Sequence, residues 1–202
     1  MTSTRQTART HWVALRAMLV LTVVLGLAYP LAVTAIGQIA LPAQANGSLV
    51  RNGGDVVGSA FIGQSFTDAA GEPLPEWFQS RPSAAGDGYD GGASSGSNFG
   101  PENEDLIAAI EERKTRVVAL DGVEEPDVPA DAVTASASGL DPHISPEYAL
   151  LQVDRVADAR GLDEAEVRAL VEDHIQAPDL GFLGEPTVNV LRLNLELAEL
   201  GD

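Results

Sequence analysis

The sequence predicts an α+β protein, in which a single N-terminal transmembrane helix is followed by one extracytoplasmic domain with few strands and about three helices. Two observations predict this class. An uncharged, largely apolar run extends from Ala17 to Val50 in the 202-residue chain. After this run, two separated strand-like segments flank three helical patterns, an arrangement typical of α+β domains. The length suits one ordinary domain and an anchor.

The apolar run has the properties of a membrane anchor. The 20 residues from Ala17 to Ile36 would cover roughly 30 Å as a helix, which is one hydrocarbon thickness. Trp12 lies where an indole prefers the membrane interface. Arginines precede the run and none follows it until Arg51, so the positive-inside rule places the N-terminus inside. The expected regions are a cytoplasmic N-terminus at 1–12, a transmembrane helix at 13–36 and an acidic extracytoplasmic domain at 37–202.

A cleaved signal peptide is the alternative to a retained anchor. Ala43-Gln44-Ala45 matches an A-x-A cleavage site after a basic N-terminal region. The apolar run is, however, longer than the usual apolar region of a signal peptide, which favours the anchor. The acidic domain lies outside the cytoplasm in either case.

The expected span also contains features typical of helix–helix contact in a membrane. Small residues allow two helices to approach closely, and polar ones can form hydrogen bonds between helices. These residues are Ala28, Ala32 and Ala35 on one face, with Thr34 and Gln38 nearby. They indicate a partner helix, although an alanine-rich composition without a special face explains them equally well. Pro30 is expected to bend the helix, because it removes one backbone hydrogen bond.

Charge and cysteine content exclude several classes of function. The first 50 residues contain three arginines and no acidic residue, so the remainder has 9 basic and 30 acidic residues, a net charge of −21. Such a surface repels phosphate, so we expect no nucleic-acid partner, and it attracts small cations. The chain contains no cysteine, which excludes disulfides, zinc–thiolate sites and thiol nucleophiles.

The first half of the acidic domain is predicted to be mostly loop. Residues 42–54 contain Pro42 and several glycines, and residues 56–66 predict a strand. Residues 68–101 predict a long loop, in which ten of the eighteen residues at 83–100 are Gly or Ser. The aromatic side chains of this loop favour an ordered binding loop over a disordered linker. They are Trp77, Phe78, Tyr89 and Phe99.

Three helices follow in the second half. Residues 102–120 have an apolar side and a charged side, and Asp121-Gly122 ends this helix. After a loop at 123–145, the second helix has Ser145 as its N-cap, Pro146 at the first position and Gly161 at its end. The third begins at Asp163, with Glu166 completing a capping box, and runs to about Ile175. Residues 187–195 predict a strand, and the tail to Leu200 a helix.

One group of polar residues has the composition of a hydrolase site. Ser136, Ser138, Asp141 and His143 lie within eight residues, and a serine nucleophile needs a histidine base and a carboxylate. Members of such a triad are seldom sequence neighbours, and the chain has no G-x-S-x-G elbow. We therefore expect a tight turn whose side chains bond the local backbone, and keep a secreted or anchored hydrolase as a minor alternative.

Metal and phosphate sites have no better support. The three histidines, His11, His143 and His174, are far apart in the sequence. Asp87-Gly88-Tyr89-Asp90 lacks the alternating ligands of a calcium loop. The chain has no Gly-rich phosphate loop followed by Lys-Ser or Lys-Thr. We expect no metal and no cofactor of the chain's own.

Several stretches carry a family resemblance, in order, over roughly residues 13–200. They are Gly58-Ser59 with Ile62-Gly63-Gln64 and Phe66; Arg81-Pro82-Ser83-Ala84 with Ser95-Gly96-Ser97-Asn98 and Gly100-Pro101; Val133-Thr134-Ala135-Ser136-Ala137-Ser138-Gly139-Leu140-Asp141-Pro142-His143-Ile144-Ser145-Pro146; Arg155-Val156-Ala157 with Ala159-Arg160; and Gly184-Glu185-Pro186 with Asn189 and Leu193-Asn194-Leu195. Together they resemble the C subunit of the Kdp potassium-transporting P-type ATPase of bacteria.

The resemblance implies an accessory, non-catalytic subunit of a complex in the bacterial inner membrane. Its implied partners are a channel-like subunit that selects K⁺, a P-type subunit that hydrolyses ATP, and a small stabilising subunit. Its implied role is to assemble or stabilise this high-affinity potassium uptake complex, which uses ATP through its catalytic subunit and transports K⁺. The alternative is a catalytic chaperone that raises the affinity of the catalytic subunit for ATP.

The positions in the family motifs are the candidate binding residues. They are Gln64, Arg81, Ser97, Asn98, Ser138, Gly139, Asp141, His143 and Glu147. The family often carries glutamine at the position of Glu147, and a carboxylate repels phosphate where an amide could donate a hydrogen bond. This departure, and a domain outside the cytoplasm where ATP is absent, favour the assembly role.

Arg81 is the basic residue to which the sequence draws most attention. It is the only one between Arg51 and Arg113, in a very acidic domain. We therefore expect it to pair with a carboxylate, either within this domain or on the channel-like subunit.

Overall fold

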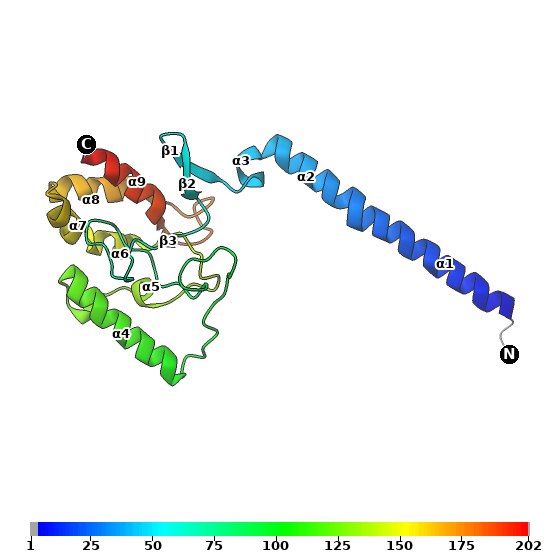
Figure 1. Cartoon of the computed structure of the whole chain (residues 1–202), viewed down its shortest axis with the longest axis horizontal. Helices are drawn as coiled ribbons and strands as arrows, with labels where there is room; N and C mark the ends of the chain where they lie inside the picture. Colours follow the sequence, from blue (N-terminus) through cyan, green and yellow to red (C-terminus); the bar gives the residue numbers. More distant parts are fainter. Residues whose placement is uncertain (1–3, 202) are drawn as a thin grey trace. The chain divides into compact units, whose positions relative to one another are not determined.

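The computed structural model describes residues 4–201 and divides into two compact units. The first unit ends at Ser48 and the second begins at Leu49. Figure 1 shows the helical first unit in blue and the mixed second unit in the remaining colours. The class predicted from the sequence is confirmed: one long apolar helix precedes a domain that contains both helices and strands.

The first unit is one nearly continuous helix. It consists of α1 (Thr4–Val23), a π-helical turn (Val24–Ala28) and α2 (Tyr29–Ala40), and a short helix, α3 (Pro42–Ala45), follows. Residues Gln6–Ala40 form the one stretch, among the residues described, that is long and apolar enough to cross a membrane. The predicted span at 13–36 lies within it.

Pro30 does not produce a sharp kink. Figure 1 shows α1 and α2 continuing in one direction. The helix widens instead in the turn that precedes the proline, where the Tyr29 N–H donates to the Val24 carbonyl, five residues back. A π turn of this kind accommodates the missing i→i−4 hydrogen bond, which the proline nitrogen cannot donate. The expected bend is therefore replaced by a local change of helix type.

The second unit begins with a β-hairpin whose first strand lies in the segment that was predicted to be a loop. Strands β1 (Leu49–Asn52) and β2 (Asp55–Ser59) pair in antiparallel order, and Asn52 faces Asp55 across the turn. The two intervening glycines have positive φ angles, which a tight hairpin turn needs. These glycines had suggested a loop at 42–54 and a strand at 56–66. The strand instead starts one residue earlier and ends at Ser59.

Helix α4 (Glu104–Asp121) follows a long segment, residues 60–103, that contains no helix or named strand. The side chain of Asn103 caps α4 by accepting hydrogen bonds from the Asp105 and Leu106 N–H groups, and Gly122 ends it in a left-handed conformation. This agrees with the predicted helix at 102–120 within two residues. The predicted loop at 123–145 contains a 3₁₀ turn (Glu125–Asp127), the short helix α5 (Ala130–Val133) and a short strand at 143–144.

A small antiparallel sheet organises the rest of the domain. Its strand order is β3 (His143–Ile144), β5 (Thr187–Asn189) and β4 (Ile175–Gln176). Helices α6 (Pro146–Leu151), α7 (Val153–Arg160) and α8 (Glu164–Asp173) connect β3 to β4. The predicted caps are confirmed, because Ser145 accepts from the Tyr148 N–H and Asp163 from the Ala165 and Glu166 N–H groups. The expected second helix is, however, broken at Gln152 into α6 and α7.

The predicted strand at 187–195 is largely wrong. Only Thr187–Asn189 is a strand, and α9 (Val190–Leu200) begins directly after it. Alternating leucines at 191, 193, 195 and 197 mimic the period of a strand. The helix forms because Asn189 caps it through the Arg192 N–H, and because the buried residues Val190, Leu193, Asn194 and Leu197 repeat with the period of a helix.

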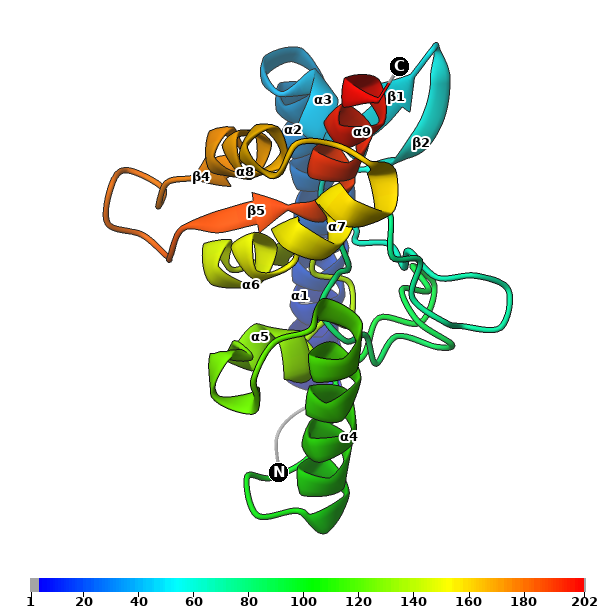
Figure 2. The same ribbon diagram turned by 90° about the vertical axis from the view of Figure 1, so that its left-hand side faces the viewer.

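One hydrophobic core joins these elements. Helices α6, α7, α8 and α9 lie around β5, as Figure 2 shows. The largest fully buried apolar side chains include Phe78, Ile144, Leu193 and Leu197. The part of this unit that the structure describes therefore contains more helices than the three expected, because the second helix is divided and the last predicted strand is mostly helical.

Candidate interaction site

Two segments that are far apart in the sequence meet at the centre of the family motifs. The part of the long loop that is rich in Gly and Ser, residues 83–100, is called here the Gly/Ser-rich loop; it contributes Ser83 and Ser95, and the segment 136–141 lies against it. The Ser95 N–H donates to the Ser138 carbonyl at 2.9 Å, and Ser83 Oγ donates to the Gly139 carbonyl at 2.6 Å. The Gly63 N–H donates to the Leu140 carbonyl at 2.9 Å. We call this contact the serine–glycine junction.

The junction explains why one motif position is glycine. Gly139 is buried and has a φ of 67°. A Cβ added there would lie 2.6 Å from the Ser95 carbonyl oxygen and 2.7 Å from the Ala85 backbone nitrogen. Only a residue without a side chain lets the two segments approach this closely. The Ser138-Gly139 pair therefore has a structural role, and its backbone is already engaged within the domain.

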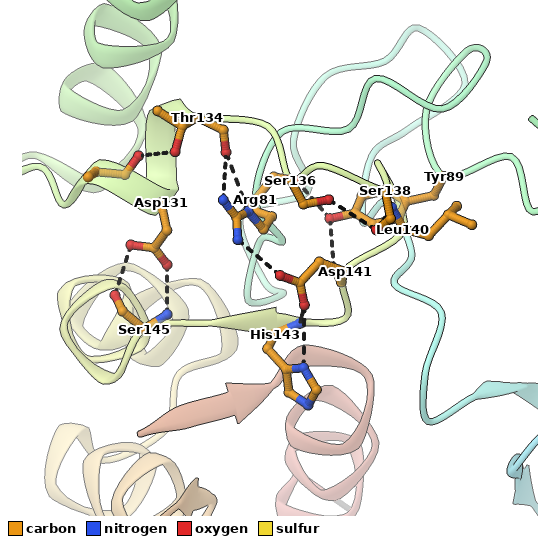
Figure 3. A network of polar contacts seen from close by, with 11 residues as sticks. Arg81, Tyr89, Asp131, Thr134, Ser136, Ser138, Leu140, Asp141, His143 and Ser145 are labelled. Atoms are coloured by element: carbon orange, nitrogen blue, oxygen red, sulfur yellow. Dashed lines mark hydrogen bonds and ion pairs between the residues drawn. The ribbon is translucent and has the colours of Figure 1, made fainter. Parts of the chain in front are cut away.

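An ion pair lies beside the junction. Arg81 Nη1 is 2.9 Å from Asp141 Oδ2, and the Arg81 guanidinium also donates to the Thr134 carbonyl at 3.4 and 3.2 Å. Tyr89 Oη donates to the Arg81 carbonyl at 2.8 Å. The side chains of Arg81 and Asp141 are 20% and 30% exposed, so the pair is partly accessible to solvent. Figure 3 shows these side chains turned toward one another. The carboxylate expected for Arg81 is therefore internal.

Asp141 is held by several groups at once. Its Oδ1 accepts from the His143 N–H at 3.0 Å and lies 3.3 Å from His143 Nδ1. Burial raises the pKa of Asp141, but the hydrogen bonds from His143 and the positive charge of Arg81 outweigh burial and lower this pKa overall. Burial also raises the pKa of Tyr89 to about 12, so this hydroxyl stays protonated and remains a donor at neutral pH. The group is an ordered polar cluster with its charges paired.

The arrangement is a turn and not a hydrolytic site. Ser138 Oγ accepts from the Leu140 N–H at 3.1 Å and lies 3.4 Å from Ser136 Oγ. Figure 3 shows the imidazole of His143 pointing away from both serines. Asp141 and Ser138 thus bond the local backbone, as the interpretation of this stretch as a tight turn predicts.

The structure gathers five of the nine candidate residues and leaves four elsewhere. Arg81, Ser138, Gly139, Asp141 and His143 lie together. Of the others, Gln64 donates to the Val57 carbonyl at 2.7 Å and so supports β2. Ser97 and Asn98 are exposed on the Gly/Ser-rich loop, and Glu147 is exposed in the first turn of α6.

The sequence did not predict the hydrogen-bonding roles of two residues of the site. Asp131 accepts from the Ser145 N–H at 2.6 Å and from Ser145 Oγ at 2.9 Å, and so fixes the start of α6. Tyr89 had been noted only as an aromatic residue of the loop. A partner 14 residues away, or a phenol bonded to a backbone carbonyl, leaves no local signal in a sequence.

A pocket of about 310 Å³ lies next to Arg81. Two further arginines line it, Arg113 and Arg116 of α4, together with hydroxyl groups and apolar side chains. The criterion that singled out Arg81 did not find these two, because Arg113, Lys114 and Arg116 lie close together in the sequence and none of them is isolated. The pocket belongs entirely to the second unit.

Metal ligands do not gather in the part of the chain that the structure describes: no group of three or more acidic, histidine or cysteine side chains could hold an ion there. The two histidines of the second unit pair with carboxylates instead, His143 with Asp141 and His174 with Glu196 at 3.4 Å. Both contacts are explained within the fold.

The fold and the site together define a single-pass membrane protein with an acidic domain that carries a paired polar cluster. The family of K⁺-transporting ATPase c chains, KdpC, matches residues 11–199. The chain belongs to this family. It is therefore a subunit of the K⁺-transporting ATPase other than the catalytic one.

Three relatives illustrate the similarity, each described as the KdpC subunit of a potassium-transporting ATPase. The protein from Kineococcus radiotolerans is 58% identical over 180 residues, which cover 89% of this chain and 88% of the relative. That from Caulobacter vibrioides is 58% identical over 187 residues, covering 91% and 90%. That from Mycobacterium tuberculosis is 54% identical over 188 residues, covering 93% and 96%. The likeness thus includes both the apolar helix and the acidic domain.

Proposed function

We propose that the chain assembles and stabilises a potassium uptake complex by docking its acidic domain, from outside the cytoplasm, on a channel-like subunit near the potassium entrance. The observation that carries this proposal is the serine–glycine junction with its paired cluster. In the junction, family-motif residues fix the shape of the Gly/Ser-rich loop. A loop of fixed shape suits recognition of a partner subunit. The net charge of −21 after residue 50 favours cations near the domain.

The test is to express the chain truncated after Ser48 together with the other subunits. We expect potassium-stimulated ATPase activity and uptake to fall, and the full-length chain supplied in its place to restore them. Full activity with the truncated chain would contradict the proposed function. The two compact units make this boundary the natural place to cut.

The orientation rests on the arginines that precede the apolar helix. Because the chain has no cysteine, a single Ser97→Cys substitution on the exposed loop gives a clean reporter. A membrane-impermeant maleimide should label it in intact cells from which the outer membrane barrier has been removed. Labelling only after the inner membrane is broken would place the domain in the cytoplasm and reverse the topology.

The small residues of the apolar helix are proposed to pack on a partner helix. Ala28, Ala32 and Ala35 are exposed in this unit, and Gln38 exchanges hydrogen bonds with the Asn46 side chain at 3.0 and 3.3 Å. Gln38 therefore has a partner in its own unit. Ala32→Leu should loosen the complex in mild detergent, because a larger side chain forces the backbones apart. Val33→Leu, outside this face, is the control, and equal copurification of both variants would count against the contact.

The second candidate function, raising the affinity of the catalytic subunit for ATP, has less support. The Ser138-Gly139 backbone is engaged in the junction, and Glu147 presents an exposed carboxylate where an amide would suit phosphate better. Glu147→Gln would favour this function if it lowered the ATP concentration needed for half-maximal activity of the complex. An unchanged value would leave the assembly role as the better account.

A further inference from the structure

The pocket beside Arg81 concentrates positive charge in a negative domain. Only nine basic residues follow residue 50, and three of them line this one pocket. Tyr89, Phe66 and Val117 also line it and make its walls partly apolar. In a domain of net charge −21, such a gathering is unexpected unless the pocket meets an anion.

Pairing within the domain leaves one of these three charges uncompensated. Arg81 pairs with Asp141, and Arg116 Nη2 lies 2.7 Å from Glu112 Oε1 on the same helix. Arg113 donates to the Val133 carbonyl at 3.0 Å, and no carboxylate of the described residues lies within ion-pair distance of it. The three arginines and two carboxylates therefore leave a surplus of one positive charge at Arg113.

The surroundings of Arg113 make this surplus costly. Its side chain is only partly exposed, and burial lowers its pKa, with the nearby Glu112 raising it and Arg116 lowering it. A guanidinium that loses water without gaining a carboxylate is less stable than a paired one. A carboxylate that enters the pocket can meet the planar guanidinium through two parallel hydrogen bonds.

We propose that this pocket receives the carboxylate of one Asp or Glu side chain of a partner subunit, with Arg113 as its anchor. A surplus of one charge matches a single carboxylate, whereas a polyphosphate would bring several unpaired charges. The inference rests on the proposed function, because it names a surface on which docking depends. Elsewhere the acidic surface repels an acidic partner segment, so this pocket also fixes where that segment can bind.

A neighbouring feature favours a protein over a small acid as the source of the carboxylate. Helix α4 runs along one side of the domain in Figures 1 and 2. The pocket that α4 lines also contains Phe66 and Tyr89, which are only partly buried. An apolar contact beside a charged anchor is the usual composition of a protein–protein interface.

The test compares arginines in the complete complex. The full-length chain is expressed with its partner subunits, the complex is immobilised through another subunit, and the retained fraction of the chain is measured in rising salt. Arg113→Gln should weaken retention about tenfold, and Arg116→Gln, at the exposed rim, about threefold. Arg168→Gln is the matched control, because Arg168 also pairs with a glutamate four residues back, Glu164, at 2.9 Å. It should leave retention unchanged.

Melting temperatures of the full-length variants in detergent separate folding from docking. If Arg113→Gln lowers the melting temperature, the test of docking rests on the retention of Arg116→Gln, because the Arg116 side chain is exposed and its replacement should not affect folding. Retention of both pocket variants equal to that of the control would overturn the proposal. A second outcome would also overturn it: citrate raises the melting temperature of the chain only when Arg113 is present, while Arg113→Gln leaves retention in the complex unchanged. The occupant of the pocket would then be a small acid.

A cross-link identifies the partner directly. A photoreactive residue in place of Thr67, an exposed residue of the pocket, should capture a peptide of another subunit that contains Asp or Glu. Adducts within the chain alone would contradict the proposal. Failure of this inference is distinct from failure of the proposed function: transport that needs the domain but not Arg113 or Arg116 overturns only the inference.

Discussion

Two arginine–aspartate pairs of the acidic domain differ in their surroundings. Arg155 Nε lies 2.7 Å from Asp121 Oδ1, and the two side chains are 6% and 1% exposed. Arg81 Nη1 lies 2.9 Å from Asp141 Oδ2, with side chains 20% and 30% exposed. The distances are nearly equal, so burial and the neighbouring groups determine what each pair does.

The Arg155 pair holds the core together. Arg155 also donates to the Pro75 and Trp77 carbonyls and, at 2.7 Å, to Gln152 Oε1. Burial raises the pKa of Asp121, although Arg155 opposes this, and Asp121 Oδ2 has no hydrogen-bond partner among the residues described. This pair fastens the irregular segment 75–79 to α7, and no partner protein can reach it.

Side chains also form the backbone hydrogen bonds of segment 75–79 that a neighbouring strand would otherwise supply. Asn194 accepts from the Phe78 N–H and donates to the Phe78 carbonyl, both at 2.9 Å. Gln152 accepts from the Gln79 N–H at 2.6 Å and donates to the Gln79 carbonyl at 3.2 Å. The comparison teaches that the buried pair belongs to a network that satisfies backbone groups, whereas the Arg81 pair lies at the edge of an open pocket.

The largest expected effect comes from breaking the buried pair. Arg155→Ala leaves Asp121 buried without its cation and removes the donor to two carbonyls, so we expect a loss of about 3–5 kcal/mol in the free energy of unfolding. Chemical unfolding of the full-length chain in detergent measures it. A smaller loss in unfolding free energy than that of Arg81→Ala would contradict the assignment of the Arg155 pair to the core.

The next effect tests the serine–glycine junction, which lies beside the partly exposed Arg81–Asp141 pair. Gly139→Ala forces a Cβ against the Ser95 carbonyl and Ala85, so we expect a loss of about 2–4 kcal/mol. Gly122→Ala is the matched control: its φ of 68° is nearly the same, but nothing lies within 4 Å of its Cβ. That variant should lose only about 1 kcal/mol. Equal losses would mean that backbone conformation alone, and not close approach, requires Gly139.

A smaller effect is expected from Arg81. Arg81→Gln removes an ion pair that is open to water, and the amide can still donate to a carbonyl, so the loss in unfolding free energy should be about 1 kcal/mol. Thermal unfolding of the full-length chain in detergent measures this loss. A loss as large as that of Arg155→Ala would mean that the pair acts as part of the core.

The smallest expected effect is on the pH dependence of the free energy of unfolding, to which Asp141 and Asp121 contribute with opposite signs. The pKa of Asp141 is lowered by folding, so its contribution is present above its unfolded pKa and is lost as pH falls through its folded pKa. The pKa of Asp121 is raised, so its contribution has the opposite sign and declines as pH rises above its unfolded pKa. Asp141→Asn should therefore flatten the acid side of the stability curve, and Asp121→Asn should steepen it. Shifts of the same sign in both variants would contradict this assignment.

The sequence by itself determined the features that depend on neighbouring residues. The apolar helix follows from an uncharged run, and the starts of α6 and α8 follow from Ser145 and Asp163, whose side chains bond N–H groups three residues away or fewer. The tight turn at Asp141 and His143 is equally local. Family membership was also readable, because the motifs occur in order along the chain.

Only the tertiary structure decided the contacts between distant segments. Alternating leucines in α9 favoured a strand until burial of every third and fourth residue selected a helix. The partner of Arg81 lies 60 residues away, and Arg113 reaches the Val133 carbonyl from another helix. Sequence periodicity carries information about one element at a time. Which side chains share a pocket depends on how all the elements pack, so the surplus charge at Arg113 is visible only in the folded domain.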